Sequence, residues 1–213
     1  MMRKIEIQLF GPIAAFARLH EVETIVLEKQ EHWQKMGYRN RFQVLGAKDV
    51  LAITVPLQGG RDQKAMTADL TIDYHGRWMK EHWRTLESLY NRSPFFYHYA
   101  PGLQQIWESR HELLWDMAEQ SLRWTLKQLR WQGAIVHSTT FSPICADDST
   151  DFRHRFLPKN RKHFLLPAYQ QTFGERFETN LSILDLLFNM GPSAAAYLKQ
   201  LPEELNQRQT HES

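Results

Sequence analysis

The chain contains a single cysteine, Cys145, among its 213 residues. One cysteine excludes an intrachain disulfide bond and a zinc site built from cysteine ligands, and it is typical of a protein in a reducing cytosol. Apolar runs are also short, because none approaches the roughly 20 residues that a membrane-spanning helix needs. The N-terminal sequence MMRKIEIQLFGP lacks the apolar core of a signal peptide. These absences predict a soluble cytoplasmic protein without a membrane span.

The common fingerprints of enzyme sites are absent as well. The sequence contains no GxGxxG, no GxxxxGK followed by Ser or Thr, no HExxH and no GxSxG motif. No obvious base lies near Cys145, and His154 and His163 are too far apart to predict a metal pair. The sequence therefore predicts no metal site, and it identifies neither a cofactor nor an oligomeric state.

The composition is that of one globular domain. Hydrophobic residues make up 42% of the chain and charged residues 23%, and 12 Phe, 7 Tyr and 7 Trp predict a bulky core. We expect a single domain over residues 1–201 and a polar tail over residues 202–213. A net charge of +2 does not indicate nucleic-acid binding. The basic, Phe-containing run from Phe152 to His163 resembles a stacking platform, but a solvated loop is the alternative, so we expect no nucleic-acid partner.

Alternating apolar residues predict strands in the first half of the chain. Lys4–Phe10 and Thr24–Leu27 are the first two, and a short helix, Ile13–His20, lies between them. This order predicts a βαβ unit with parallel strands. Further strands are predicted, the first two of them paired as a hairpin, at Asn40–Leu45, Leu51–Leu57 and Ala68–Asp73.

The second half of the chain is predicted to be mainly helical. Arg77–Asn91 has the apolar arc of an amphipathic helix, and Pro101–Trp131 forms one long helix or two abutting ones. Ala134–His137 is a short strand candidate, residues 138–162 are irregular, and Ser193–Leu201 is a last short helix. The predicted fold class is α/β, with an N-terminal βαβ-type sheet core followed by a mainly helical second half.

The stretch Asn180–Pro192 predicts a buried helix, because its apolar residues cover well over half of a helical wheel. Its polar residues fall in one narrow seam and are Ser182, Asp185 and Asn189. A carboxylate on a buried helix needs a partner or a wet cleft. One interpretation is a groove in which Asp185 pairs with Arg41 or Arg84. The alternative is a helix cap, in which Ser182 and Asp185 form a capping box.

The run Tyr38-Arg39-Asn40-Arg41 leads into the first strand of the hairpin. Alternation places Tyr38 and Asn40 on one side of the chain and both arginines on the other. Two guanidinium groups on one face can bind a phosphate or a carboxylate. A solvated strand edge, whose charges prevent aggregation, is the alternative.

The helix Arg77–Asn91 carries the remaining candidates. His82 lies within its apolar arc, where a histidine serves either as a general base or as a hydrogen-bonded core residue. Lys80 and Arg84 lie on the polar face, where they either bind phosphate or stay solvated.

Together these motifs resemble the WbqC-like protein family. The resemblance runs in order over nearly the whole chain and rests on YRNR at 38–41 with Leu45-Gly46, TVP at 54–56, Trp78, Lys80, HWRT at 82–85, Tyr90, SPFF at 93–96, Tyr99, NLSILDLLFN at 180–189 and Gly191-Pro192. Gln8–Pro12 and residues 138–162 depart from the family pattern. The resemblance implies a role in bacterial O-antigen, lipopolysaccharide or other surface-polysaccharide biosynthesis, and it assigns no reaction.

Two hypotheses follow for the function. The first is a transferase that acts on a nucleotide-activated sugar or an amino sugar, with His82 as general base and Asp185 orienting a base or binding a sugar hydroxyl. The residues expected to bind its substrate are Tyr38, Asn40, Arg41, Lys80, Arg84, Tyr90 and Asn189. The second is a non-catalytic scaffold or regulatory partner of a polysaccharide enzyme, which would use exposed tryptophans of Pro101–Trp131 as its contact surface.

Overall fold

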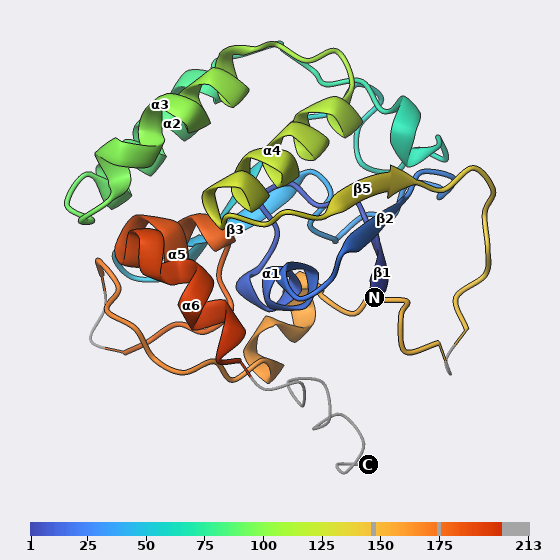
Figure 1. The fold of residues 1–213 in the computed structure, drawn as a ribbon. Helices are drawn as coiled ribbons and strands as arrows, with labels where there is room; N and C mark the ends of the chain where they lie inside the picture. Colours follow the sequence, from blue (N-terminus) through green and yellow to red (C-terminus); the bar gives the residue numbers. More distant parts are fainter. Residues whose placement is uncertain (146–147, 174–175, 202–213) are drawn as a thin grey trace, which may run out of the picture.

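A computed structural model describes residues 1–145, 148–173 and 176–201 (Figure 1). A parallel sheet has the strand order β1-β2-β5, with β1 at Met2–Glu6, β2 at Thr24–Glu28 and β5 at Ala134–His137. Helix α1 (Ile13–His20) connects β1 to β2, which confirms the predicted βαβ unit. The first strand ends at Glu6 rather than at the predicted Phe10.

A separate two-stranded hairpin, β3 (Arg41–Leu45) and β4 (Val50–Thr54), confirms the predicted antiparallel pair. The backbone N–H of Gly46 closes its turn by donating to Asp49 O at 3.0 Å. A side chain at position 46 would place its Cβ only 2.6 Å from that oxygen, so the turn requires glycine. The prediction of a strand at Ala68–Asp73 is wrong.

That segment instead begins with a short 3-10 helix, η1 (Thr67–Asp69), followed by isolated bridges from Thr71 to Leu113 and from Ile72 to Leu57. The amphipathic helix predicted over Arg77–Asn91 is confirmed as α2 (Trp78–Tyr90). The stretch after it, predicted as one long helix or two abutting ones, forms two helices.

These two helices are α3 (Phe96–Glu108) and α4 (Leu114–Gln128), and they begin and end a few residues earlier than the predicted stretch Pro101–Trp131. Pro101 lies inside α3 instead of opening it, and the break between the helices contains Arg110, whose φ is 46°. In Figure 1, α4 runs beside β5, and the antiparallel pair α2 and α3 lies beyond it.

The buried helix predicted at the C-terminal end is α5 (Ile183–Met190), which is followed by η3 (Gly191–Ser193) and α6 (Ala194–Lys199). Every residue from Ile183 to Phe188 is buried. The residues just before α5 also cap α1, because Asn180 Oδ1 accepts a hydrogen bond from Ala14 N at 2.9 Å. This contact satisfies an N-terminal donor of α1 that Pro12, its own N-cap residue, cannot serve.

One aromatic core joins the hairpin to the helices. The Phe10 ring lies edge-on to Phe42 at 5.3 Å and to Trp124 at 6.3 Å, and Phe42 in turn contacts Trp107 at 6.2 Å. No helix within the described ranges is long and apolar enough to cross a membrane. The predicted polar tail, 202–213, lies outside the described residues.

Candidate active site

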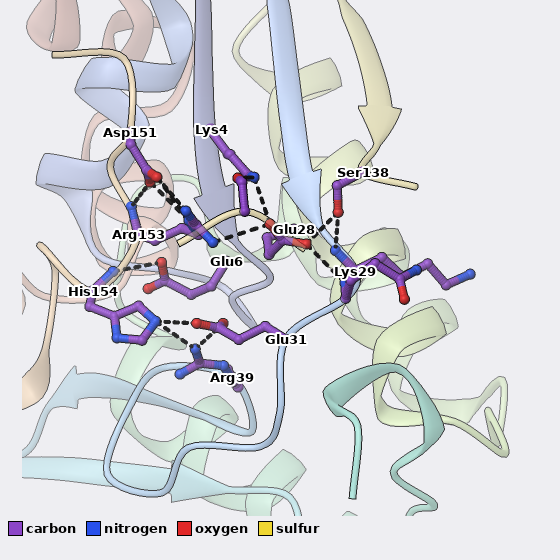
Figure 2. A network of polar contacts seen from close by, with 12 residues as sticks. Lys4, Glu6, Glu28, Lys29, Glu31, Arg39, Ser138, Asp151, Arg153 and His154 are labelled. Atoms are coloured by element: carbon purple, nitrogen blue, oxygen red, sulfur yellow. Dashed lines mark hydrogen bonds and ion pairs between the residues drawn. The ribbon is translucent and has the colours of Figure 1, made fainter. Parts of the chain in front are cut away.

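Polar side chains gather at the carboxyl ends of the parallel strands (Figure 2). Glu6 ends β1 and Glu28 ends β2, and the two residues are partners in the sheet register. Ser138 follows β5 directly; it donates a hydrogen bond to Glu28 and accepts one from Lys29 N at 3.0 Å. Ligands of open α/β sheets bind beyond the carboxyl ends of the strands, so this edge is the candidate site.

An arginine from a distant part of the sequence neutralises two carboxylates at this edge. Backbone hydrogen bonds hold residues 150–152 alongside Lys4 in β1. The Arg153 guanidinium then lies between Glu28, at 3.1 Å, and Asp151, at 2.5 Å. Lys4 Nζ lies 2.6 Å from the same Glu28 carboxylate. Burial raises the pKa of Glu28, but hydrogen bonds from Lys4 and Ser138 outweigh it and hold that pKa below its ordinary value.

A second ionic group joins Glu31, Arg39 and His154. Arg39 NH2 donates to Glu31 Oε2 at 2.5 Å, and His154 Nε2 contacts the other oxygen, Oε1. The same Nε2 lies 3.3 Å from Arg39 NH2. A neutral imidazole nitrogen either donates or accepts, and the neighbouring carboxylate favours an Nε2–H donor. Burial raises the pKa of Glu31, but hydrogen bonds from His154 and the charge of Arg39 outweigh it, so this pKa is lowered.

The other ring nitrogen of His154 faces outward. Nδ1 has no hydrogen-bond partner in the described part of the chain, and it is not among the buried polar atoms without a partner. The His154 side chain is 23% exposed, so Nδ1 is open to solvent. With the proton on Nε2, the lone pair of Nδ1 is free to take a proton from a ligand.

The backbone of His154 is strained in a way that fixes this orientation. Its φ is 61°, in the left-handed region that costs a non-glycine residue on the order of 1 kcal/mol. Its N–H donates to Glu6 Oε2 at 2.9 Å, and Gln8 Nε2 donates to Glu6 Oε1 at 2.8 Å. Such strain persists only where the surroundings over-determine the conformation, which is common at functional sites.

Three of the residues predicted from the sequence meet inside the protein. Asp185 is fully buried, and its carboxylate accepts hydrogen bonds from Tyr90 Oη at 2.8 Å, Tyr169 Oη at 2.5 Å and Gln171 Nε2 at 3.1 Å. Asn189 Nδ2 donates to the backbone oxygen of Asp185 at 2.8 Å. Hydroxyl and amide donors thus surround Asp185. Neither predicted arginine partner is among its contacts in the described ranges.

The capping box predicted for this helix is also absent from the described contacts. Ser182 Oγ caps α5 by accepting from Leu184 N at 3.3 Å, while the Asp185 side chain turns to the tyrosines instead. Ser182 thus caps the helix alone, and its hydroxyl also donates to Phe10 O at 2.8 Å.

The run from Tyr38 to Arg41 is divided between several roles. Tyr38 Oη donates to Gln43 Oε1 at 2.8 Å, and Asn40 Nδ2 donates to Val55 O at 2.9 Å, so both side chains are tied to the hairpin. Both are buried. Arg39 belongs to the His154 cluster, whereas Arg41 has no side-chain partner within the described residues.

The candidates on α2 lie apart from the cluster. The His82 ring contacts Trp78 and Trp107, its Nδ1 is buried without a partner, and burial lowers its pKa. Arg84 is exposed. Lys80 lines a cavity of about 370 Å³ between α2 and α3, together with Met79, Trp83, Gln104, Trp107, Glu108 and Arg110. Arg41, His82, Arg84 and Asp185 are joined by no hydrogen bond, ion pair or ring contact in the described ranges, and their predicted roles stay predictions.

Sequence reasoning did not identify the cluster around His154. A signal was present, because Glu6 and Glu28 end the two strands of the predicted βαβ unit and Glu31 follows shortly after. The residues 150–154 were assigned to an irregular, charge-dense stretch. Nothing local in that stretch predicts that it lies against β1.

The cluster is organised as ion pairs rather than as a cation site. Among the described residues, no group of three or more His, Cys, Asp or Glu side chains could hold a metal ion. The carboxylates of Glu28, Glu31 and Asp151 are already engaged by arginine or lysine nitrogens.

Comparison with known proteins identifies a family. The model of the WbqC-like protein family matches residues 9–160 and 148–197. The matches include Glu28, Glu31, Arg39 and the 150–154 segment, whereas β1 precedes them. The comparisons with curated proteins and with solved structures return no match. Because the family matches cover most of the chain and agree with the motifs, the chain belongs to the WbqC-like protein family.

Proposed function

We propose that this protein is a cytoplasmic transferase of bacterial surface-polysaccharide biosynthesis, such as that of O-antigen, with His154 as its general base. The donor is a nucleotide-activated sugar, and the acceptor carries a hydroxyl or an amino group. The observation that supports the proposal is the pairing of His154 with Glu31 at the carboxyl ends of parallel strands. A base held by a carboxylate, with its other nitrogen open, is an arrangement suited to group transfer.

The proposed step moves one proton and exchanges one bond. The acceptor O–H or N–H gives its proton to Nδ1 of His154 while the acceptor lone pair bonds to the anomeric carbon of the donor. The bond between that carbon and the phosphate oxygen breaks, and the nucleoside diphosphate leaves with the bonding electrons. Glu31 stabilises the imidazolium that forms.

The alternative, a non-catalytic scaffold, depended on exposed tryptophans in the α3–α4 region. The indoles of Trp107 and Trp115 are buried, and those of Trp124 and Trp131 pack against the core. These tryptophans therefore serve mainly as core residues, which does not favour the exposed contact surface that the alternative needs. The phenylalanines between residues 152 and 164 are likewise buried, with the Phe152 and Phe156 rings stacked at 6.1 Å, which does not favour nucleic-acid binding.

Release of nucleoside diphosphate from a panel of nucleotide sugars, with and without amino-sugar and sugar acceptors, tests the proposal. We expect one donor to be turned over, and His154→Gln to lower kcat by about 100-fold or more, as loss of a general base does. Glu31→Gln should lower kcat because the imidazole loses its carboxylate partner.

His98→Gln is the matched control, because His98 is an exposed histidine on α3 outside the cluster. It should retain the wild-type rate. Turnover by His154→Gln at the wild-type rate would contradict the assignment. Thermal-shift screening gives an independent result, since a donor that binds must raise the melting temperature.

A further inference from the structure

Arg41 is an arginine without a partner. It is the first residue of β3, its side chain is half-buried, and its Nε is buried with no hydrogen-bond partner. No ion pair engages its guanidinium in the described part of the chain. A charged group removed from water without a partner is costly, so the free protein holds this side chain at an energetic disadvantage.

A second arginine adds to that disadvantage. Burial, and then the positive charge of nearby Arg61, lower the pKa of Arg41. Asp62, which follows Arg61 in the chain, lies 2.6 Å from Lys35 and 3.5 Å from Arg61, on the surface. Lys35 and Arg61 therefore share this carboxylate, whereas no ion pair in the described ranges joins it to Arg41. Two guanidinium groups that repel each other are stabilised when an anion binds between them.

Each arginine lies close in the chain to a contact of the His154 cluster. Arg41 follows Arg39 by two residues, and Arg39 contacts both Glu31 and His154. Arg61 is joined to the segment that contains Glu31. Trp33 Nε1 donates to Arg61 O at 2.8 Å, and Trp33 N donates to Ala65 O at 2.9 Å. Thr67 N donates to the backbone oxygen of Glu31, also at 2.9 Å. Residues 61–67 thus run alongside residues 31–33, and the latter segment supplies the carboxylate that holds His154.

We propose that Arg41 and Arg61 bind the diphosphate of the nucleotide-activated donor, an inference that rests on the proposed function. The planar guanidinium fork matches phosphate oxygens in a bidentate manner. The segment shared with Glu31 then brings the phosphate end of the donor to the side of the cluster where His154 acts. The cost of the unpaired Arg41 in the free protein is recovered on binding.

Isothermal titration calorimetry of the full chain with inorganic pyrophosphate tests this site without turnover. The wild type should bind, with an affinity that falls as salt is added. Arg41→Gln should weaken binding about tenfold or more, as loss of a charge-assisted hydrogen bond does. Arg92→Gln removes an exposed arginine that lies just after α2. This control should change the Kd by less than about twofold, because an exposed charge contributes little.

The melting temperature supplies a second readout. Because Arg41 is unpaired and close to Arg61, Arg41→Gln should melt no lower than the wild type when pyrophosphate is absent. Pyrophosphate should raise the melting temperature of Arg41→Gln less than that of the wild type. Should Arg41→Gln fail to fold, Arg61→Gln takes its place, because that side chain is 73% exposed. The inference is overturned if the wild type shows no saturable binding of pyrophosphate. It is also overturned if the variant at Arg41, or the one at Arg61 that replaces it, binds pyrophosphate as tightly as the wild type does.

His154→Gln separates this inference from the proposed function. That variant should bind pyrophosphate as the wild type does while losing turnover. If pyrophosphate binding depends on Arg41 but the wild type turns over no nucleotide sugar, the phosphate site is supported and the transferase proposal is contradicted. If turnover depends on His154 but pyrophosphate binding does not depend on Arg41, the transferase proposal is supported and the phosphate site is contradicted.

Discussion

Asp185 holds three parts of the fold together, and its replacement should show how much this residue contributes to the stability of the protein. Its carboxylate receives Tyr90 from α2 and both Tyr169 and Gln171 from the segment that precedes α5. Tyr90 Oη also accepts from Leu45 N in β3 at 3.2 Å. One buried carboxylate therefore connects α5 to α2, to the preceding segment and, through Tyr90, to the hairpin.

We expect Asp185→Ala to destabilise the protein by roughly 2–6 kcal/mol. The substitution leaves the hydroxyls of Tyr90 and Tyr169 without their acceptor, and each unsatisfied buried donor costs about 1–3 kcal/mol. The Gln171 amide keeps Glu178 O as an acceptor. A typical domain has only about 5–15 kcal/mol of stability, so this loss is a large fraction. Asp185→Asn should cost about 2 kcal/mol, because its amide keeps one acceptor but turns an N–H toward another donor.

Urea denaturation followed by tryptophan fluorescence and far-UV circular dichroism measures these losses. The midpoint should fall while the m-value stays constant, since the substitution does not change the surface exposed on unfolding. Asp116→Ala is the matched control, because Asp116 also lies in the first turn of a helix but is exposed. It should cost at most about 1 kcal/mol, from its interaction with the helix dipole. A loss below about 1 kcal/mol for Asp185→Ala would refute the reasoning.

The pH dependence gives the same reasoning a second test. Burial raises the pKa of Asp185 above its ordinary value of 3.8, although the tyrosines and Gln171 oppose it. The folded protein therefore binds this proton more tightly than the unfolded chain, and the resulting stabilisation is present below pH 3.8 and lost as the pH rises through the raised pKa. The stability difference between wild type and Asp185→Asn should thus be larger in acid than at neutral pH. A difference that grows with pH would contradict this sign.

Three further predictions concern the rest of the structure. Arg153→Met should destabilise by about 3–5 kcal/mol in urea denaturation, because it leaves the buried Asp151 carboxylate without its ion pair and Glu28 with Lys4 alone. Arg123→Met, on an exposed i,i+4 pair, should cost under about 1 kcal/mol. The protein should lose stability as the pH falls through the lowered pKa values of Glu28, Glu31 and Asp151. Their stabilisation is fully present only above the ordinary pKa of a carboxyl group. A pH titration followed by circular dichroism, in which Arg153→Met loses part of this dependence, supports the prediction. Gly133→Ala should lower the melting temperature, because its Cβ would lie 2.4 Å from the backbone oxygen of Glu23; an unchanged melting temperature would contradict that contact.

The elements that the sequence predicted well depend on local patterns. The helix Ile13–His20 and the strand Ala134–His137 have the predicted bounds, because Pro and Gly mark their starts and apolar periodicity fills them. The strand expected at Ala68–Asp73 failed since an apolar run of that length does not distinguish a strand from a bridged loop. Pro101 was predicted to open a helix, but aromatic residues before it are buried, and their packing extends α3 back to Phe96.

The candidate site was harder to predict because its parts are far apart in sequence. His154 and Glu31 are separated by 123 positions, and Arg153 and Glu28 by 125. Only the pairing of residues 150–152 with β1 brings them together, and a single sequence does not encode that pairing in any local pattern. The helix α5 was predicted correctly as buried, but the partners of its polar seam were not. An arginine in a groove and a capping box were the two interpretations for Asp185, whereas tyrosine hydroxyls and an amide serve as its donors.

The energetic cost of the cluster supports a functional rather than a purely structural role for it. Replacing buried ion pairs with apolar side chains of similar volume is often neutral or stabilising, so closing the sheet edge does not require charges. Here the edge holds buried carboxylates, a left-handed His154 and an imidazole nitrogen left open to solvent. The Asp185 network differs in this respect, because its carboxylate is enclosed and none of its oxygens is left for a ligand. Of the two buried polar networks, only the one at the strand ends retains a group that can react.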